Sequence, residues 1–411
     1  MKSFEHDQYP GKPKILFVGI GDSTHTHSWI DLLEGAQINV RLFPATNTLP
    51  PDDWKVKSYV TQYDSQGGDP ASRMRLFDKG KAGRLVGRTL ARVSRRPWNT
   101  TGLVSAWLAE IVKSWRPDVI HTLGLEPASY FYLNVRRQYG LSGIGKWVAQ
   151  VRGGPDLALH RLLPEYAGRI RAVLEACDQL IADNDQNYEL ALGMGLRPEQ
   201  LSPLGVVPGT GGIDVAALAS SWSGPPSKRD IVLWPIAYEC PQKKALPVLE
   251  ALKLAWHSIT PRTVHILSTI PETRMWFATL PEEVRNGCVI EERIPRARVL
   301  ELMTRARVML APSLSDGIPN SMYEAMAGGA FPIVSPLDSI RTLVENERNV
   351  LFARNLYPDE IAAALSRAMS DDALVDAAAD RNLDLVRRIA ERSTIKSRVV
   401  EYYETLARQI S

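Results

Sequence analysis

Short runs of consecutive apolar residues recur along the chain, and segments with the period of an amphipathic helix separate them. The first two runs cover residues 14–19 and 38–43, and a helical segment begins between them at His27. Apolar runs without polar alternation are typical of strands that are buried on both faces of a parallel sheet. Strands that alternate with helices in this way predict βαβ units and a doubly wound α/β sheet.

The same alternation continues to the end of the chain. Further strands are predicted at residues 116–121, 146–151, 178–182, 230–235, 264–268, 289–295, 308–312 and 331–334. Further helices are predicted at residues 103–112, 166–176, 184–194, 297–304, 358–369, 373–390 and 394–410. At 411 residues the chain is too long for one ordinary hydrophobic core, so we expect two domains. The glycine-rich segment 204–214 suits a hinge between them.

The most informative stretch is a βαβ unit at residues 308–334. An apolar run leads into a loop rich in glycine and proline, and a helix follows that Gly328 and Gly329 are expected to end in left-handed geometry. Asn320 or Ser321 is expected to cap this helix at its start. The first turn would then point unpaired N–H groups beyond the end of a parallel strand, where anionic ligands bind.

Two carboxylates flank this first turn. Asp316 lies in the loop, and Glu324 follows eight residues later inside the helix. Glu324 also fits a purely structural role, because with Ser321 it has the spacing of a capping box, in which the carboxylate accepts a hydrogen bond from the helix's own first amide. The ligand-binding interpretation is favoured, because both acids, the glycine loop and the flanking strands occur together at matching positions of one βαβ unit.

The segment from Asp316 to Gly329 resembles the E-x7-E signature of retaining GT-B glycosyltransferases, in particular glycosyltransferase family 4. An acidic residue precedes Gly-Ile-Pro-Asn, and Glu324 opens the sequence Glu-Ala-Met-Ala-Gly-Gly. The chain departs from the family pattern in two places here. The first acid is aspartate rather than glutamate, and the family's Pro-Glu pair is replaced by Arg341-Thr342.

The resemblance implies a GT-B fold, in which two Rossmann-like, doubly wound parallel-sheet domains face a cleft. Residues 1–208 would form an N-terminal domain that binds the acceptor. Residues 209–392 would form a C-terminal domain that binds the nucleotide sugar. Residues 393–411 would form a helix that crosses back to the N-terminal domain.

The resemblance also implies where the sugar donor binds. In the family, the first strand of the second domain runs into Gly-Arg, and a lysine follows about five residues later. Here the arginine is missing and the lysine is doubled, and Lys244 matches the family position better than Lys243. The implied catalytic residues are Asp316, Glu324 and Lys244. The implied donor-binding residues are Gly317, Ile318, Pro319, Asn320, Ser321, Lys243, Arg293, Ile294 and Gly21.

The loop after the first strand carries Gly19 and Gly21 but lacks the third glycine of a dinucleotide-binding fingerprint, so a NAD site is not favoured. Its sequence around His25 resembles instead the Ser-x-His-Thr start of many family 4 N-terminal domains. This implies that His25 contacts the acceptor or the sugar. A helix-capping or surface histidine is the alternative.

Three more residues in the first half are implied as acceptor or sugar contacts. His121 ends a strand that resembles the family's Pro-Asp-Val-Ile-His, which places it at the cleft, with a core histidine as the alternative. Arg152 and Asp156 occur where family members carry Arg-Gly-Ser-Asp beside the transferred sugar.

Composition and cysteine use indicate a soluble protein of a reducing compartment. Apolar residues make up 45% of the chain and charged residues 23%, as in ordinary globular proteins. No apolar run approaches the roughly 20 residues that span a bilayer, and the N-terminus lacks the apolar core of a secretory signal. The three cysteines are isolated. We therefore expect a cytoplasmic protein.

Residues 73–96 form a strongly basic stretch with a single acid. Its structural interpretation is a solvated charged helix face. The alternative is a surface that contacts anionic lipid headgroups, which would place the protein peripherally at the inner face of the membrane. Nucleic acid is not expected as a partner, because the run lacks a series of interleaved aromatic residues for base stacking.

Together these features predict a retaining glycosyltransferase that moves a sugar from a nucleotide-diphosphate sugar to a glycan, lipid-linked or small-molecule acceptor. The resemblance implies no cofactor and no metal, and no cluster of metal ligands is visible in the sequence. Three alternatives remain: a hydrolase that uses the two carboxylates, a sugar-nucleotide epimerase of the same architecture, and a catalytically silent GT-B-like binding or partner subunit.

Overall fold

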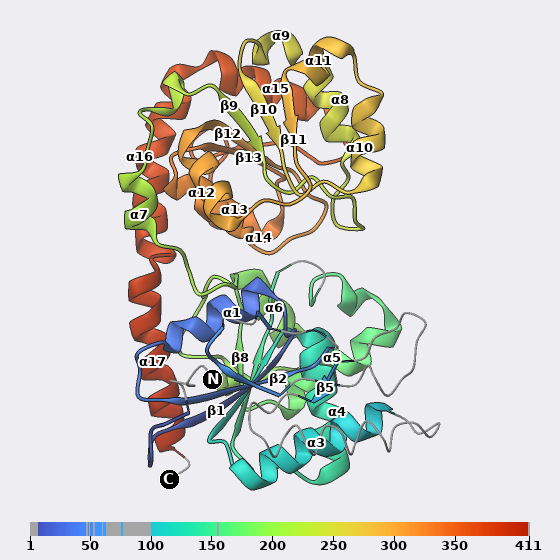
Figure 1. Cartoon of the computed structure of the whole chain (residues 1–411), viewed down its shortest axis with the longest axis vertical. Coiled ribbons are helices and arrows are strands. Elements are labelled where there is room, and N and C mark those ends of the chain that lie inside the picture. Colours follow the sequence, from blue (N-terminus) through green and yellow to red (C-terminus); the bar gives the residue numbers. More distant parts are fainter. Residues whose placement is uncertain are drawn as a thin grey trace.

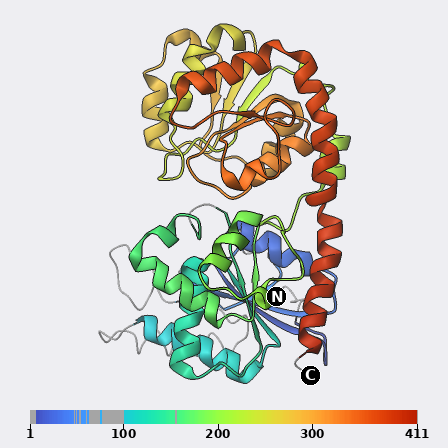
Figure 2. The same cartoon turned by 180° about the vertical axis from the view of Figure 1, so that it is seen from behind.

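The computed structural model describes residues 7–46, 48, 50–51, 54–59, 61–62, 75–76, 100–153 and 156–409. Two α/β domains lie one above the other, and the two C-terminal helices run along one side of both (Figures 1 and 2). Each domain contains a six-stranded sheet in which all pairings are parallel. This confirms the predicted GT-B architecture. The basic stretch 73–96 lies outside the described residues, apart from the backbone of Arg75–Leu76.

The N-terminal sheet has the strand order β3-β2-β1-β6-β7-β8. Its strands are β1 (Lys14–Gly19), β2 (Asn39–Pro44), β3 (Lys57–Ser58), β6 (Val119–Leu123), β7 (Lys146–Gln150) and β8 (Gln179–Ile181). Its helices are α1 (Thr24–Ile30), α3 (Thr100–Trp115), α4 (Tyr130–Tyr139), α5 (Pro164–Ala176) and α6 (Asp185–Gly193). A short antiparallel pair is formed by β4 (Thr61–Gln62) and β5 (Arg75–Leu76).

The C-terminal sheet repeats this topology with the order β11-β10-β9-β12-β13-β14. Its strands are β9 (Ile231–Trp234), β10 (Thr263–Ile266), β11 (Cys288–Ile290), β12 (Ala306–Ala311), β13 (Phe331–Val334) and β14 (Leu351–Phe352). Its helices are α7 (Val215–Ser220), α8 (Leu246–Leu254), α9 (Trp256–Ile259), α10 (Pro271–Ala278), α11 (Glu282–Asn286), α12 (Arg296–Arg305), α13 (Asn320–Ala327), α14 (Asp338–Arg341), α15 (Pro358–Ser370) and α16 (Asp372–Ile389).

The apolar runs form strands because both faces of each sheet are covered. Along β1, Ile15 and Phe17 belong to the apolar cluster on one face, whereas Leu16 and Val18 belong to the cluster on the other. The strands of the second sheet divide in the same way between two clusters. In sheets of this order, the loops that follow the two central strands diverge at a topological switch point, and ligands bind there. The switch points lie between β1 and β6 and between β9 and β12.

The last helix, α17 (Arg392–Arg408), packs on the N-terminal domain although α16 belongs to the C-terminal one (Figure 1). Tyr403 of α17 accepts a hydrogen bond from the indole of Trp29 at 3.0 Å. Arg392 donates to the carbonyl of Ser28 at 2.7 Å. The chain therefore crosses between the domains twice, once in each direction.

The two crossings are bonded to each other. The amide of Ile213 donates to the carbonyl of Ala390, and the amide of Arg392 donates back to the carbonyl of Ile213, both at 2.9 Å. Gly211 and Gly212, directly before this point, have φ of 77° and 83°, which side chains larger than glycine rarely adopt. The two segments that connect the domains are thus bonded to each other at one junction.

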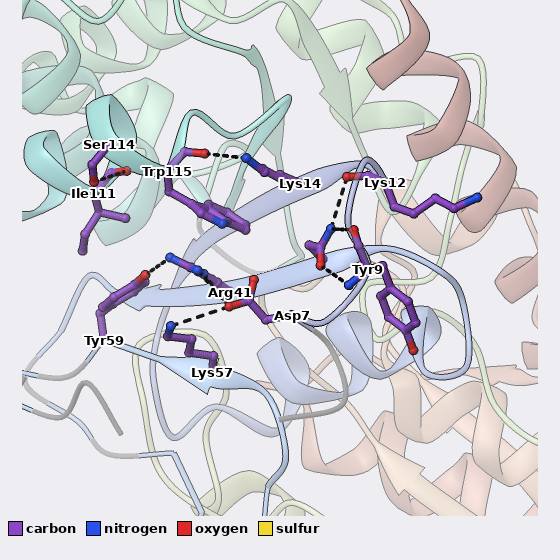
Figure 3. A network of polar contacts seen from close by, with 11 residues as sticks. Asp7, Tyr9, Lys12, Lys14, Arg41, Lys57, Tyr59, Ile111, Ser114 and Trp115 are labelled. Carbon is purple, nitrogen blue, oxygen red and sulfur yellow. Dashed lines mark hydrogen bonds and ion pairs between the residues drawn. The ribbon is translucent and has the colours of Figure 1, made fainter. Parts of the chain in front are cut away.

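The segment before β1 is fastened to the N-terminal sheet by a polar network (Figure 3). Arg41 on β2 donates to Asp7 at 2.8 Å and also contacts the hydroxyl of Tyr59, and its guanidinium lies 4.2 Å from the ring centre of Trp115. Lys14 donates to the carbonyl of Trp115 at 3.1 Å. These contacts hold the start of the sheet, away from the strand ends that face the C-terminal domain.

Candidate active site

Two loops meet at the switch point of the C-terminal sheet. Residues 235–245 follow β9 and residues 312–319 follow β12. The carbonyl of Gln242 accepts a hydrogen bond from the amide of Leu314 at 2.7 Å. The buried side chain of Asn355 bonds Lys244 from one loop and the carbonyl of Pro312 from the other. The loops that carry the predicted lysines and the predicted aspartate are thus held together.

The two lysines have different partners. The Nζ of Lys243 lies 3.7 Å from Oδ2 of Asp316. The Nζ of Lys244 lies 3.2 Å from Oε1 of Glu239. Burial raises the pKa of Asp316, and the charge of Lys243 opposes this rise. Of the two lysines, Lys243 is therefore the one that the structure brings to the predicted carboxylate.

Helix α13 begins at Asn320 without a side-chain cap, because its N-cap position is Pro319. The expected cap from Asn320 or Ser321 was wrong. The Oδ1 of Asn320 instead accepts a hydrogen bond from Thr210 of the linker at 2.9 Å, and the buried hydroxyl of Ser321 has no partner. The helix ends as expected, with Gly329 at φ 77°. Its first turn consequently offers free N–H groups and an unsatisfied hydroxyl.

Glu324 lies on α13 and its side chain is only 7% exposed. Its Oε1 is 2.6 Å from Nη2 of Arg296, the first residue of α12, but this contact is not aligned as a hydrogen bond. Burial raises the pKa of Glu324, and the charge of Arg296 opposes the rise. No capping-box bond to the first turn of α13 is formed. Glu324 is thus a buried carboxylate whose ion-pair partner, among the described residues, is Arg296.

The loop of Asp316 touches the N-terminal domain at its glycine. A Cβ placed on Gly153, after β7, would lie 2.6 Å from both N and Cα of Gly317. Asp183, which follows β8, lies against the same point, because a Cβ on Gly317 would be 2.5 Å from its Oδ2. The two domains therefore meet backbone to backbone, beside the predicted first acid.

Asp183 is a titratable group that sequence reasoning missed. It is buried and accepts hydrogen bonds from the amide of Gly153 at 2.7 Å and from the side-chain amides of Asn184 and Asn187 at 2.8 and 2.9 Å. Burial is the main cause that raises its pKa to about 7, and the charge of Asp316 adds to the rise. The available signal was its place directly after a predicted strand end, where switch-point ligands gather.

His25 and Arg152 approach the C-terminal domain from the N-terminal one. His25 lies in the first turn of α1 and keeps an exposed surface, yet its surroundings desolvate it. This desolvation, together with the charges of Arg152 and Arg296, lowers the pKa of His25 to about 4. The imidazole is therefore neutral at pH 7. Burial lowers the pKa of Arg152 to about 10, and its guanidinium donates to Gln150 at 3.4 Å.

His121 is fully buried, and Asp156 is half-buried and bonded to two loops of its own domain. The ring of His121 has no exposed surface, lies against Trp29 and contacts the hydroxyl of Tyr403 through Nδ1 at 2.5 Å. It therefore does not face the other domain as expected, because the side of β6 that carries it is covered by α17. Asp156 accepts hydrogen bonds from the amides of residues 125, 126 and 152, so it ties two loops together. Burial raises its pKa to about 6.

The other predicted donor residues lie on three different loops: Arg293 and Ile294 between β11 and α12, Ile318 after β12, and Gly21 after β1 in the N-terminal domain. Arg293 is exposed, whereas Ile294 and Ile318 pack against the apolar cluster behind α13. Gly21 is buried after β1, where a Cβ would lie 2.4 Å from the carbonyl of residue 48, and its own carbonyl contacts the ring of His27 at 2.7 Å.

Besides Asp183, three residues of this region were not predicted, namely Arg296, Ser339 and Asn355. Ser339 donates to the carbonyl of Asp316 at 2.9 Å and so holds the acid's loop. In the described part of the chain, no group of three or more His, Cys, Asp or Glu residues is arranged to hold a metal ion. None of the helices described is long and apolar enough to cross a membrane.

The two repeated sheets, the facing strand ends and the returning helix α17 define a two-domain α/β protein of the GT-B fold. Within it, residues 230–371, about a third of the chain, match the family model described as Glycosyl transferases group 1. A search among curated proteins found no match.

Solved structures resemble the chain over almost its full length. Anabaena Alr3699/HepE in complex with UDP-glucose has a TM-score of 0.67 at 13% identity, over 94% of this chain and 98% of that one. A glycosyltransferase from Rickettsia africae has a TM-score of 0.66 at 13% identity, over 96% and 99%. Sucrose-phosphate synthase from Thermosynechococcus elongatus has a TM-score of 0.65 at 16% identity, over 97% and 100%. At these identities the likeness shows the fold.

Proposed function

We infer that this protein is a retaining glycosyltransferase that uses a nucleotide-diphosphate sugar as donor. The observation that carries the inference is the start of α13. Its amides are uncapped and the hydroxyl of Ser321 is unpaired, with Asp316 and Lys243 on one side and the buried Glu324 on the other. A helix N-terminus that lacks a cap attracts a phosphate, and two carboxylates on either side suit the hydroxyls of a ribose and of a sugar.

In the pose that we propose, Glu324 accepts hydrogen bonds from the ribose hydroxyls. The diphosphate lies against the amides of Asn320 and Ser321, with Lys243 as its nearest lysine. Asp316 holds hydroxyls of the sugar. Lys243 replaces Lys244 in this role, because Lys243 lies beside Asp316 whereas Lys244 is paired with Glu239.

The proposed chemistry breaks the bond between the sugar's anomeric carbon and the diphosphate oxygen. Negative charge grows on the departing diphosphate, and the amide end of α13 with Lys243 stabilises it. The acceptor's oxygen forms the new bond on the same face of the sugar and passes its proton to the departing phosphate oxygen. No separate base and no metal ion take part in this scheme. His25 is neutral at pH 7 and adjoins the same space, so it would contact the sugar or the acceptor through hydrogen bonds.

Two comparisons support the proposal. The matched segment 230–371 contains both carboxylates and both lysines. The structure of Anabaena HepE, which has the same architecture, is of a complex with UDP-glucose. Membrane contact through residues 73–96 and a place in the cytoplasm remain parts of the proposal that rest on sequence alone.

The proposal is tested by thermal stabilisation with a panel of nucleoside diphosphates. A ligand at 100 times its dissociation constant adds about 2.7 kcal/mol to the free energy of unfolding. Glu324→Gln removes the charge that would hold the ribose, and if its affinity falls about 100-fold, the same concentration adds only about 0.4 kcal/mol. A wild-type protein that no nucleotide stabilises would contradict the proposal. Donor conversion without any acceptor would favour the epimerase.

A further inference from the structure

Among the described residues, Arg296 is the cation that pairs with Glu324, and neither the sequence motif nor the loop after β9 accounts for it. We propose that Arg296 supplies the diphosphate-binding guanidinium that is missing after β9, and that Glu324 holds it until the donor's ribose arrives. This inference rests on the proposed function and names a residue that binds the donor.

The cations near the start of α13 do not by themselves suit a diphosphate. A nucleotide diphosphate brings at least two negative charges, and arginine is suited to phosphate because its planar fork donates two parallel bonds. Lys243 is shared with Asp316, and Lys244 is shared with Glu239. Neither lysine provides a fork, so the site lacks the guanidinium that such a ligand favours.

The guanidinium of Arg296 lies close enough to the start of α13 to contact a phosphate bound there. Glu324 follows Asn320 by four residues, which is roughly 6 Å along a helix that rises 1.5 Å per residue. A guanidinium 2.6 Å from Glu324 is therefore within about one helical turn of the amides where the diphosphate would lie. The charge of Arg296 is also felt by His25 across the domain interface, where it helps to lower that histidine's pKa.

The contact between Arg296 and Glu324 can open without disturbing the fold. The side chain of Arg296 is 59% exposed, and Glu324 is its sole ion-pair partner among the described residues. When ribose hydroxyls donate to Glu324, the guanidinium is released one turn away from the incoming phosphates.

Arg298 offers a matched control. It lies on the same helix two residues later, and its guanidinium is 2.5 Å from Oε1 of Glu301 on the surface. Arg296→Gln and Arg298→Gln therefore remove the same charge from the same helix, but only the first change touches the proposed site.

The experiment measures dissociation constants by calorimetry for UDP, GDP and ADP, and then for the nucleoside of the diphosphate that binds best. For Arg296→Gln we expect the diphosphate to bind roughly 10- to 100-fold more weakly, the range of a charge-assisted hydrogen bond. The nucleoside should bind as well as before or better, because Glu324 is free. Arg298→Gln should match the wild type for both ligands.

Equal diphosphate affinity in Arg296→Gln and wild type would overturn the inference while leaving the proposed function standing. Stronger binding of diphosphate and nucleoside in parallel would do the same, because Arg296 would then only obstruct Glu324. A wild type that binds no nucleotide would overturn both. If Arg296→Gln does not fold, the double variant Arg296→Gln/Glu324→Gln is compared with Glu324→Gln alone. This comparison gives the same test, because neither variant contains an unpaired buried carboxylate at position 324.

Discussion

The contact between Gly153 and Gly317 makes a sharp prediction about how the domains fit together. In Gly153→Ala the new Cβ would start 2.6 Å from the N and Cα of Gly317, whereas an ordinary contact needs at least about 3.4 Å. The obstacle is backbone of the other domain, so no side chain can turn away from it. The domains must separate by roughly 0.8 Å at this point. In an enzyme, misplacing the reacting groups by about 1 Å can slow the catalysed reaction on the order of 100-fold.

His25 reports this separation without any knowledge of the substrates. Its pKa is lowered to about 4 by desolvation and by the charges of two arginines, one of them Arg296 of the opposite domain. We expect its NMR titration midpoint to rise in Gly153→Ala, towards the usual value of about 6.5, because Arg296 of the opposite domain would then lie farther away. The melting temperature should hardly change, since neither domain core is touched.

The control is Gly168→Ala, because a Cβ on this helical glycine of α5 meets nothing within 4 Å. It should leave the midpoint of His25 unchanged and stabilise the protein by roughly 0.5–1 kcal/mol. A midpoint of His25 near 6.5 in the wild type, or one that stays near 4 in Gly153→Ala, would refute this account of the interface.

Three further predictions concern single side chains. Lys243→Ala should weaken nucleoside diphosphate binding by about tenfold, and Lys244→Ala by less than about threefold, because Lys243 lies beside Asp316 in the proposed site whereas Lys244 is paired with Glu239. Equal losses in calorimetry would contradict the assignment. Asp183 has a pKa of about 7 in the folded protein and roughly 3.9 in an unfolded chain, so the folded state binds its proton more tightly. The free energy of unfolding therefore falls as the pH rises from about 4 to 7. In Asp183→Asn this fall should be smaller, as urea unfolding at pH 5 and 8 would show, and an unchanged difference would contradict it. Tyr403→Phe should cost about 1–3 kcal/mol in urea unfolding, because the ring of His121 and an indole N–H lose their buried partner; a loss below about 0.5 kcal/mol would argue against that network.

The fold was predictable because its signal is local. Each central strand is a short run that is apolar on both faces, and the structure places β1, β9 and β12 within two residues of the predicted runs. The alternation with helices then leaves few topologies, since parallel crossovers are right-handed and adjacent. The predicted helix at residues 297–304 differs from α12 by one residue at each end.

The residues of the candidate site could be predicted only where they share one segment of the chain. Asp316, Glu324 and the glycines around them are contiguous, so the motif identifies them. Arg296 and Asp183 come from other elements, and only the tertiary structure brings them to this segment. The chain likewise does not reveal that the strand face of His121 is covered by a helix more than 250 residues later.

Local rules also failed at the start of α13. Asn and Ser are favoured N-caps, but Pro319 takes that position and the side chain of Asn320 bonds the interdomain linker instead. The capping box failed for the same reason, since Glu324 faces α12 rather than its own first turn. Local sequence preferences are expected to be violated at functional sites, where a ligand supplies the hydrogen-bond partners that a capping side chain would otherwise provide.

The most direct test of the central claim is a crystal structure of the protein with the nucleoside diphosphate that binds best. The account predicts phosphate oxygens within hydrogen-bonding distance of the amides of Asn320 and Ser321, and ribose hydroxyls on Glu324. A nucleotide bound elsewhere, or one whose ribose lies away from Glu324, would contradict it.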